Sequence, residues 1–382
     1  MVVIFIMNTA GIYIHIPFCK SKCIYCDFYS VADQDERIEQ FVSALILEIR
    51  TCPVVTTKWT FDTIYIGGGT PSLLNAHQME KVISALYDRY DLCKITELTI
   101  EANPGEAPKE KLKDFYSLGI NRLSIGVQSF KPEVLKFISR IHSTEDIFKT
   151  FQSARDVGFK NINCDLIYNI PNQSLEDWRN DLDTLIKLNP EHISAYSLTV
   201  EQNTKLFDLV HNKTIKMPHD ELHQYFNDII YSSLQNNNYI QYEISNYSKS
   251  NRECLHNLHY WKNDHYLGFG PSAHSYDGEK RWNNFSNLER YISFIDNNKS
   301  PIEKSEILSE IDKINEIVGF GLRMTKGFTI SRIPSHLEPQ FQKQLKQAKI
   351  KFPKMIIEKT NRIKLSQMGF NFADAIAVEL LI

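Results

Sequence analysis

Three cysteines near the start of the chain place the strongest constraint on what it can form. Cys19, Cys23 and Cys26 have the spacing C-x3-C-x2-C and follow the apolar, β-prone run 12–17 (IYIHIP). Three thiolates at this spacing can bind three irons of a [4Fe–4S] cube and leave the fourth iron open to a small molecule. The segment therefore predicts an iron–sulfur centre at the end of a buried strand.

Two other uses of these cysteines fit the sequence less well. Zinc could bind the three thiolates and His15, but structural zinc sites usually use two separated ligand pairs, and no second pair follows. Disulfides are not expected in a chain of 382 residues with seven cysteines and no export signal. Cys164 lies in an apolar run and is expected in the core, whereas Cys52 and Cys93 have no ligand spacing.

Composition excludes several classes of partner. The chain is 42% hydrophobic and 23% charged, with a net charge of −3, which predicts neither nucleic acid binding nor a general attraction to anionic membranes. No apolar run could span a bilayer, so any membrane association is expected to be peripheral. The apolar start 1–7 makes a poor signal peptide, and Met7 is an alternative start. We expect a cytoplasmic protein, since exposed cluster thiolates need a reducing compartment.

Strand-like runs alternate with helical patterns through the first half of the chain, which predicts an α/β fold with a parallel sheet covered by helices. Six such units could form either a doubly wound sheet or a partial barrel. The strands are expected at 12–16, 63–68, 97–102, 122–127, 161–168 and 192–198. The helices are expected at 35–51, 75–90, 108–118, 131–138, 144–157 and 174–188.

The amino-acid composition changes twice after this first half of the chain. We take 1–240 as the α/β domain, and 241–295, which is rich in Tyr, His and Asn, as a connecting segment. From 296 to 382, Lys, Glu and Ile dominate, with helical patterns at 308–323 and 337–350 and a hairpin near 354–370. This last part is predicted to be a small separate α+β domain.

Polar residues recur where the predicted strands end. Glu101 ends the third strand and could accept hydrogen bonds from ribose hydroxyls, while Gln128 ends the fourth. Asp165 lies inside an apolar strand and needs a partner, because burying an unpaired charge is costly. Arg140 could bind a carboxylate with its guanidinium, or could simply complement the end of a helix. The glycine run 67–69 would let the backbone approach a ligand, although turns also use glycine freely.

Taken together, these motifs resemble the radical S-adenosylmethionine (SAM) proteins. The set YIHIPFC, GGGTPS, EANP, RLSIGVQSF, RIHS and DLIYNIPNQ is similar, over nearly the whole chain, to the oxygen-independent coproporphyrinogen oxidase family. The resemblance implies a partial (β/α)6 radical SAM barrel with a small C-terminal α+β domain, and a [4Fe–4S] cluster whose open iron binds SAM. It also implies that SAM contacts Tyr13, Gly67, Gly68, Gly69, Thr70, Glu101, Gln128, Arg140 and Asp165.

That family has two branches. The coproporphyrinogen III dehydrogenases carry a fourth cysteine where this chain has Phe28, and a long N-terminal arm, whereas here 18 residues precede Cys19. The HemW-type haem chaperones have the C-D-F ending and an HNxxYW motif, which occurs here as 256–261 (HNLHYW). The resemblance therefore implies a haem chaperone that delivers haem to acceptor proteins and lacks dehydrogenase activity. The dehydrogenase reaction is the alternative, and a homodimer is possible.

The HNxxYW segment has two interpretations. Imidazole binds iron well and aromatic rings can stack on a porphyrin, so His256 is the first choice for a haem ligand, followed by Cys254 and His259. The same residues could instead form a structural corner, in which His and Asn satisfy backbone groups and Trp261 fills the core.

Overall fold

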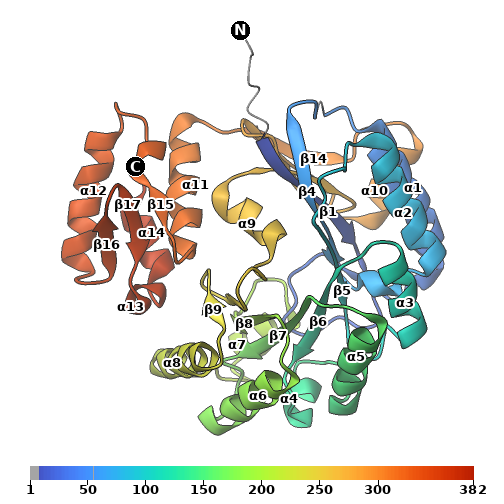
Figure 1. Ribbon diagram of the computed structural model, residues 1–382, viewed down its shortest axis with the longest axis horizontal. Helices are drawn as coiled ribbons and strands as arrows, with labels where there is room; N and C mark the ends of the chain where they lie inside the picture. The colour runs from blue at the N-terminus through green and yellow to red at the C-terminus, as the bar shows by residue number, and fades with distance from the viewer. Residues whose placement is uncertain (1–7, 55) are drawn as a thin grey trace.

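The computed structural model of the chain describes residues 8–54 and 56–382. The run 1–7 and the alternative start at Met7 lie outside these residues. Within the described residues, the main sheet has twelve strands in the order β14-β13-β12-β11-β1-β4-β5-β6-β7-β8-β10-β9. It curves through the right and lower parts of the molecule, and a smaller C-terminal domain stands beside it (Figure 1).

The centre of this sheet is a run of parallel strands that pair in chain order. Because the order never reverses, the chain winds in one direction, as in a barrel and not as in a doubly wound sheet. The sheet keeps two edges, at β9 and β14, which confirms the predicted partial barrel. The strands are β1 (Asn8–Ile16), β4 (Trp59–Gly68), β5 (Glu97–Ala102), β6 (Arg122–Gln128), β7 (Ile162–Tyr168) and β8 (His192–Ser197).

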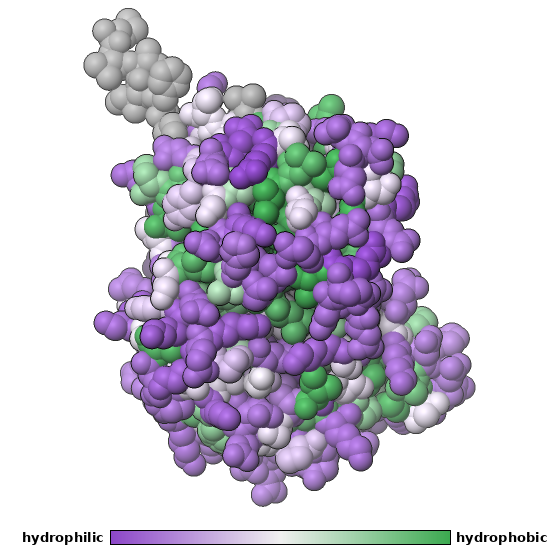
Figure 2. All heavy atoms as spheres, turned by 90° about the vertical axis from the view of Figure 1, so that its right-hand side faces the viewer, coloured by the Kyte–Doolittle hydropathy of each residue, from purple (hydrophilic) through white to green (hydrophobic). Residues whose placement is uncertain are grey.

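Helices pack against the outer face of these strands (Figure 1). Asn75, Ser143 and Ser174 each begin a helix with a capping box, in which side chain and backbone satisfy each other's hydrogen bonds. The surface over α1, α2 and α3 is largely hydrophilic, with small apolar patches (Figure 2). The helices are α1 (Ile38–Thr51), α2 (Ala76–Arg89), α3 (Lys109–Ser117), α4 (Pro132–Phe137), α5 (Thr144–Val157) and α6 (Leu175–Leu188), with short turns η1 (Asp35–Arg37) and η2 (Pro71–Leu73).

The segment 241–295, predicted as a connection, instead extends the main sheet on both sides. β10 pairs with β8 in antiparallel fashion, and β11 pairs with β1 in parallel fashion. These strands have between two and six residues, too few to show a clear periodicity in sequence. The elements from 240 to 307 are β9 (Ile240–Gln241), β10 (Asn246–Ser248), α9 (Leu255–Lys262), β11 (His265–Phe269), β12 (His274–Tyr276), β13 (Lys280–Asn284), α10 (Leu288–Asp296) and β14 (Ile302–Ile307).

Helix α9 differs from the other helices because it lies on the concave side of the sheet (Figure 1). It contacts β1, β4 and, from the other side, α11 of the C-terminal domain. Two helices that precede α9 in sequence, α7 (Lys205–His211) and α8 (Asp220–Asn236), complete the lower part of the barrel. The two strands of the cysteine loop, β2 (Phe18–Cys19) and β3 (Val31–Ala32), pair only with each other.

The predicted C-terminal α+β domain has its own core. Ile314, Phe341 and Ile363 are buried there against a three-stranded sheet of order β15-β17-β16. This core begins with α11, since β14 still pairs with β13 in the main sheet. The elements are α11 (Glu310–Arg323), β15 (Phe328–Thr329), η3 (Ile330–Arg332), α12 (Glu338–Lys351), β16 (Ile356–Lys359), β17 (Arg362–Leu365), α13 (Gln367–Phe370) and α14 (Ala373–Leu380). None of the helices described is long and apolar enough to cross a membrane.

Candidate functional site

A cavity of about 940 Å³ opens at the carboxyl ends of the parallel strands. Its walls come from the barrel strands, the cysteine loop, Asn257 of α9 and the C-terminal segments 367 and 370–375. Most of the predicted site residues line it, although they are far apart in sequence. These are Cys19, Cys23, Cys26, Gly68, Gly69, Thr70, Glu101, Gln128, Arg140 and Asp165.

The three cysteines share the loop that follows β1. The amide of Cys26 donates a hydrogen bond to the carbonyl of Cys23 over 3.3 Å, which makes the loop turn on itself. Gly69 packs directly behind it, because a Cβ at this position would lie 2.5 Å from the Phe18 carbonyl oxygen and 3.0 Å from Cys19 Sγ. Only glycine fits there, so the second βα loop supports the cysteine loop.

The donor set fits a [4Fe–4S] cluster better than a single metal ion. Among the described residues, no three His, Cys, Asp or Glu side chains converge on one ion. A cubane cluster takes one thiolate per iron, so its ligands stand apart around a shared cavity, as Cys19, Cys23 and Cys26 do. Burial raises the pKa of Cys26 to about 11, so binding iron here would release a proton. A bound cluster of this kind supplies an open iron for a ligand and one-electron chemistry.

Two hydrogen-bond donors reach the thiols from the barrel. The Thr70 hydroxyl lies 3.6 Å from Cys19 Sγ, and Nη1 of Arg140 lies 3.6 Å from Cys23 Sγ. Asn103 joins these two donors, since its amide nitrogen donates to Thr70 Oγ1 over 2.9 Å and its oxygen accepts from Arg140 over 2.5 Å. A continuous set of hydrogen bonds therefore links the first and second cysteines through Asn103, the residue that follows β5.

Asn103 was not singled out from the sequence. It lines the cavity and lies in the EANP motif, two residues after Glu101, so the motif itself was the available signal. The C-terminal residues that close the cavity, such as Phe370 and Phe372, carried no comparable signal, because only the docking of the two domains brings them there.

The two predicted carboxylates lie inside the barrel with defined partners. Glu101 accepts hydrogen bonds from the Tyr65 hydroxyl at 2.7 Å and the Gly68 amide at 3.1 Å, and burial raises its pKa to about 7. Asp165 accepts from the Asn163 amide at 2.8 Å and the Ser124 hydroxyl at 3.4 Å. The expectation that Asp165 needs a partner is thus met by neutral donors from β6 and β7.

Gln128 and Arg140 are held firmly at the cavity wall. Gln128 has a φ of +68°, a left-handed conformation that is costly for a residue with a side chain. The next turn is fixed by Asp181 of α6, which accepts from the Ser129 hydroxyl at 2.6 Å and the Phe130 amide at 2.7 Å. Arg140 donates to the carbonyl of Gly126 over 2.7 Å.

Tyr13 and Gly67 lie behind the cavity wall and do not line it. The Tyr13 ring stacks on Tyr65, with 6.2 Å between centroids, and its hydroxyl lies 3.0 Å from His15 Nδ1. A Cβ on Gly67 would lie 2.8 Å from the Tyr65 ring. Both residues therefore pack against Tyr65, which lines the cavity.

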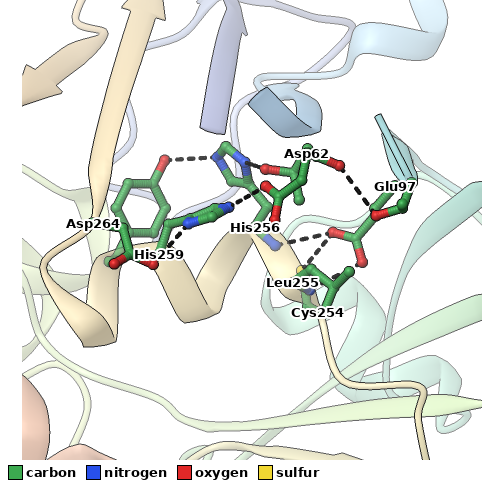
Figure 3. A network of polar contacts seen from close by, with 10 residues as sticks. Asp62, Glu97, Cys254, Leu255, His256, His259 and Asp264 are labelled. Atoms are coloured by element: carbon green, nitrogen blue, oxygen red, sulfur yellow. Dashed lines mark hydrogen bonds and ion pairs between the residues drawn. The ribbon is translucent and has the colours of Figure 1, made fainter. Parts of the chain in front are cut away.

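His256, the predicted haem ligand, lies inside the barrel and outside the cavity lining (Figure 3). It is 1% exposed, and burial lowers its pKa well below the usual range, so the ring is neutral. Its Nδ1 lies 2.9 Å from Thr63 Oγ1 and its Nε2 lies 3.0 Å from the Tyr260 hydroxyl. Neither ring nitrogen is available to iron in this arrangement, so ligation by His256 stays a prediction that would require α9 to move.

The two alternative ligands are also engaged (Figure 3). Glu97 of β5 accepts hydrogen bonds from the amides of Leu255 and His256, at 3.0 and 3.1 Å, and lies 3.5 Å from Cys254 Sγ. This carboxylate caps the first turn of α9, where unpaired amides favour negative charge. His259 lies between two carboxylates, 2.7 Å from Asp62 and 3.0 Å from Asp264.

The chain is similar in sequence to known proteins over most of its length. The family model of the radical SAM superfamily matches residues 13–185. The heme chaperone HemW of Bacillus subtilis is 37% identical over 324 residues, which cover 84% of this chain and 85% of that protein. The heme chaperone HemW of Lactococcus lactis is 31% identical over 375 residues, 97% of each chain.

One solved structure agrees over nearly the whole chain. Coproporphyrinogen III oxidase (HemN) of Escherichia coli superimposes with a TM-score of 0.86, covering 99% of this chain and 91% of that one, at 23% identity. At this identity the likeness establishes the fold alone, whereas the sequence identity to the chaperones extends over most of both chains. The chain is thus a member of the radical SAM superfamily and belongs to its HemW family.

Proposed function

We propose that this protein is a haem chaperone, which binds haem as cargo and delivers it to acceptor proteins while carrying a [4Fe–4S] cluster and SAM. The observation that carries the proposal is the single cavity shared by the three cysteines, the SAM-contacting candidates and the C-terminal domain. It joins a metal centre on one wall to a second domain on the other, in a chain of the HemW family. At about 940 Å³ it is near the upper end of the volumes that ligand sites usually have.

We assign the cluster to Cys19, Cys23 and Cys26. Contact with SAM is assigned to residues that line the adjoining wall, and Tyr13 and Gly67 support them from behind. In this arrangement, Arg140 and Asn103 have polar atoms beside the cysteine loop, where the charged end of SAM would bind. Glu101 is deeper in the barrel and suits a hydroxyl donor, since each carboxylate oxygen can accept a second hydrogen bond. The remaining candidates on this wall are Gly68, Gly69, Thr70, Gln128 and Asp165.

Phe28 supports the chaperone over the dehydrogenase. It follows Cys26 by two positions, where the dehydrogenase branch has a further cysteine, and the residue is 63% exposed at the cavity. An exposed aromatic side chain at a cavity mouth suits a large apolar ligand such as haem. It has no role in holding a cluster.

The test is a titration of the anaerobic, cluster-reconstituted protein with haem, followed by transfer to an apo haem protein. We expect stable haem binding, transfer to the acceptor, and no conversion of coproporphyrinogen III when SAM and a reductant are present. A protein that fails to retain haem would contradict the proposal. Turnover of coproporphyrinogen III would establish the dehydrogenase reaction in its place.

Three further points belong to the proposal. We place the protein in the cytoplasm, because seven free thiols suit a reducing compartment. Its partners would be haem and haem-accepting proteins, with a homodimer possible and membrane contact peripheral at most. Size-exclusion chromatography with and without the cluster would test the dimer.

A further inference from the structure

Arg323, the last residue of α11, has unused hydrogen-bonding capacity at the cavity. It is the one cation that the described C-terminal domain contributes to the cavity lining. Its guanidinium lies 4.0 Å from Glu243 and 4.0 Å from Asp374, and both distances exceed that of a hydrogen bond. Its Nε is buried without a hydrogen-bond partner among the described residues. The Arg323 guanidinium, a planar group with five N–H donors, therefore lines the cavity without a hydrogen bond to another described residue.

The position of this guanidinium is nevertheless fixed. It lies over the ring of Trp261 in α9, with 4.7 Å between Cζ and the ring centroid. Trp261 in turn packs against Phe320 of α11, with 6.2 Å between centroids. Stacking of this kind holds an arginine flat and leaves its edge free to meet a planar partner.

Two carboxylates lie beside the guanidinium, and neither is within hydrogen-bond distance of it. Glu243 is fully buried, and its Oε1 accepts from the Ser245 backbone amide at 2.9 Å and the Asn246 side-chain amide at 2.5 Å. Its Oε2 lies 4.0 Å from Arg323 and has no hydrogen-bond partner among the described residues. The side chain of Asp374 is 96% exposed, so water screens its attraction to Arg323. A carboxylate that entered the cavity could therefore still compete for the guanidinium.

The other cations at the cavity are less suited to this role. Arg122 is 1% exposed and begins β6, at the amino end of the barrel, away from the cavity mouth. Arg140 is committed to Asn103 and Gly126, and Lys22 belongs to the cysteine loop. Among the described Arg and Lys residues of the cavity lining, Arg323 is the one that belongs to the C-terminal domain.

We propose that Arg323, held flat by Trp261, is the carboxylate anchor of the cargo site and binds a propionate of haem with paired N–H donors. This inference rests on the proposed function, since the cargo supplies the carboxylate. Arginine matches a carboxylate with two parallel hydrogen bonds, which lysine does not. The site would orient haem with its carboxylate edge toward α11.

The test compares haem with haem dimethyl ester, which lacks the carboxylates, in the same detergent buffer. Wild-type protein should bind haem about tenfold or more tightly than the ester, the size of effect that a charge-assisted hydrogen bond has. Arg323→Gln should remove this preference, because it should weaken haem binding about tenfold and leave binding of the ester unchanged. Arg323→Lys should keep part of the preference, because it retains the charge.

The control is Arg281→Gln. Arg281 also binds α11, donating to Glu316 over 2.5 and 2.9 Å, but it does not line the cavity. It should leave the preference intact. If Arg323→Gln weakens the binding of haem and of the ester equally, or weakens neither, Arg323 is not the carboxylate anchor even though the protein binds haem. If the wild type binds neither ligand, the proposed function fails and the anchor fails with it. A wild type that binds haem and ester equally overturns the anchor without any variant.

Discussion

The buried His259 should make the stability of this protein depend on pH in a defined way. The side chain is 5% exposed, and although burial alone would lower its pKa, hydrogen bonds to Asp264 and Asp62 raise it to about 9. An unfolded histidine has a pKa near 6.5, so the folded state binds the proton more tightly. The stabilisation is therefore fully present below about pH 6.5 and is lost as the pH rises through about 9.

The size of this effect follows from the two pKa values. A tenfold difference in proton affinity is worth about 1.4 kcal/mol, so pKa values of 6.5 and about 9 correspond to about 3 kcal/mol. Other buried groups also titrate in this range, because burial raises the pKa of Glu48 to about 7. The informative quantity is therefore the difference in free energy of unfolding between the wild type and His259→Gln.

Urea denaturation at a series of pH values from 6 to 10, followed by circular dichroism, measures that difference. We expect His259→Gln to be less stable at pH 6 and the gap to shrink by about 3 kcal/mol by pH 10. His336→Gln is the control, because His336 pairs with Glu310 on the surface, with 62% of its side chain exposed, and such pairs contribute little. If the difference in free energy of unfolding between the wild type and His259→Gln stays constant or widens as the pH rises, His259 is not charged in the folded protein.

Three further outcomes are expected. Replacing Cys19 with Ala should abolish the iron and the visible absorption of the reconstituted protein, whereas Cys93→Ala should change neither, since Cys93 is exposed and lies outside the cavity. Glu101→Ala should weaken SAM binding by about 1–3 kcal/mol in calorimetry, and unchanged affinity would remove Glu101 from the site. Asp181→Ala should lower the free energy of unfolding by about 2–4 kcal/mol, because it leaves two buried donors unpaired. The exposed Asp183→Ala is its control, and equal losses would contradict the role of Asp181.

The barrel could be predicted because its elements are specified locally. Each parallel strand is a short, nearly continuous apolar run, and helix starts such as Asn75 and Ser174 are marked by their own side chains. The predicted strand 97–102 and helix 144–157 coincide with β5 and α5. The cavity residues could then be placed together, because the carboxyl ends of parallel strands meet at one edge of the sheet.

The elements after 240 could not be placed in the same way. The pairing of β11 with β1 joins residues about 250 positions apart, and nothing in the short run 265–269 indicates its partner. The placement of α9 could not be predicted for the same reason, since its partners Thr63 and Glu97 lie on β4 and β5, 193 and 159 positions before His256 in sequence. Sequence alone could not distinguish whether the HNxxYW motif binds haem or forms a structural corner, because both roles require buried histidine and aromatic residues.

In the structure, the side chains of this motif point to different parts of the molecule: His256 to Thr63 inside the barrel, and Trp261 to Arg323 of the C-terminal domain. Loss of haem on replacing His256 would therefore not by itself identify an iron ligand. Removing the imidazole leaves the Thr63 and Tyr260 hydroxyls unpaired, loosens α9 and disturbs the ring that holds Arg323. The two roles differ in their spectra: loss of an iron ligand shifts the Soret band of bound haem, whereas loss of the support under Arg323 lowers affinity for haem and leaves the band in place. Measuring both the Soret band and the haem affinity of His256→Ala therefore distinguishes an iron ligand from a residue that supports α9.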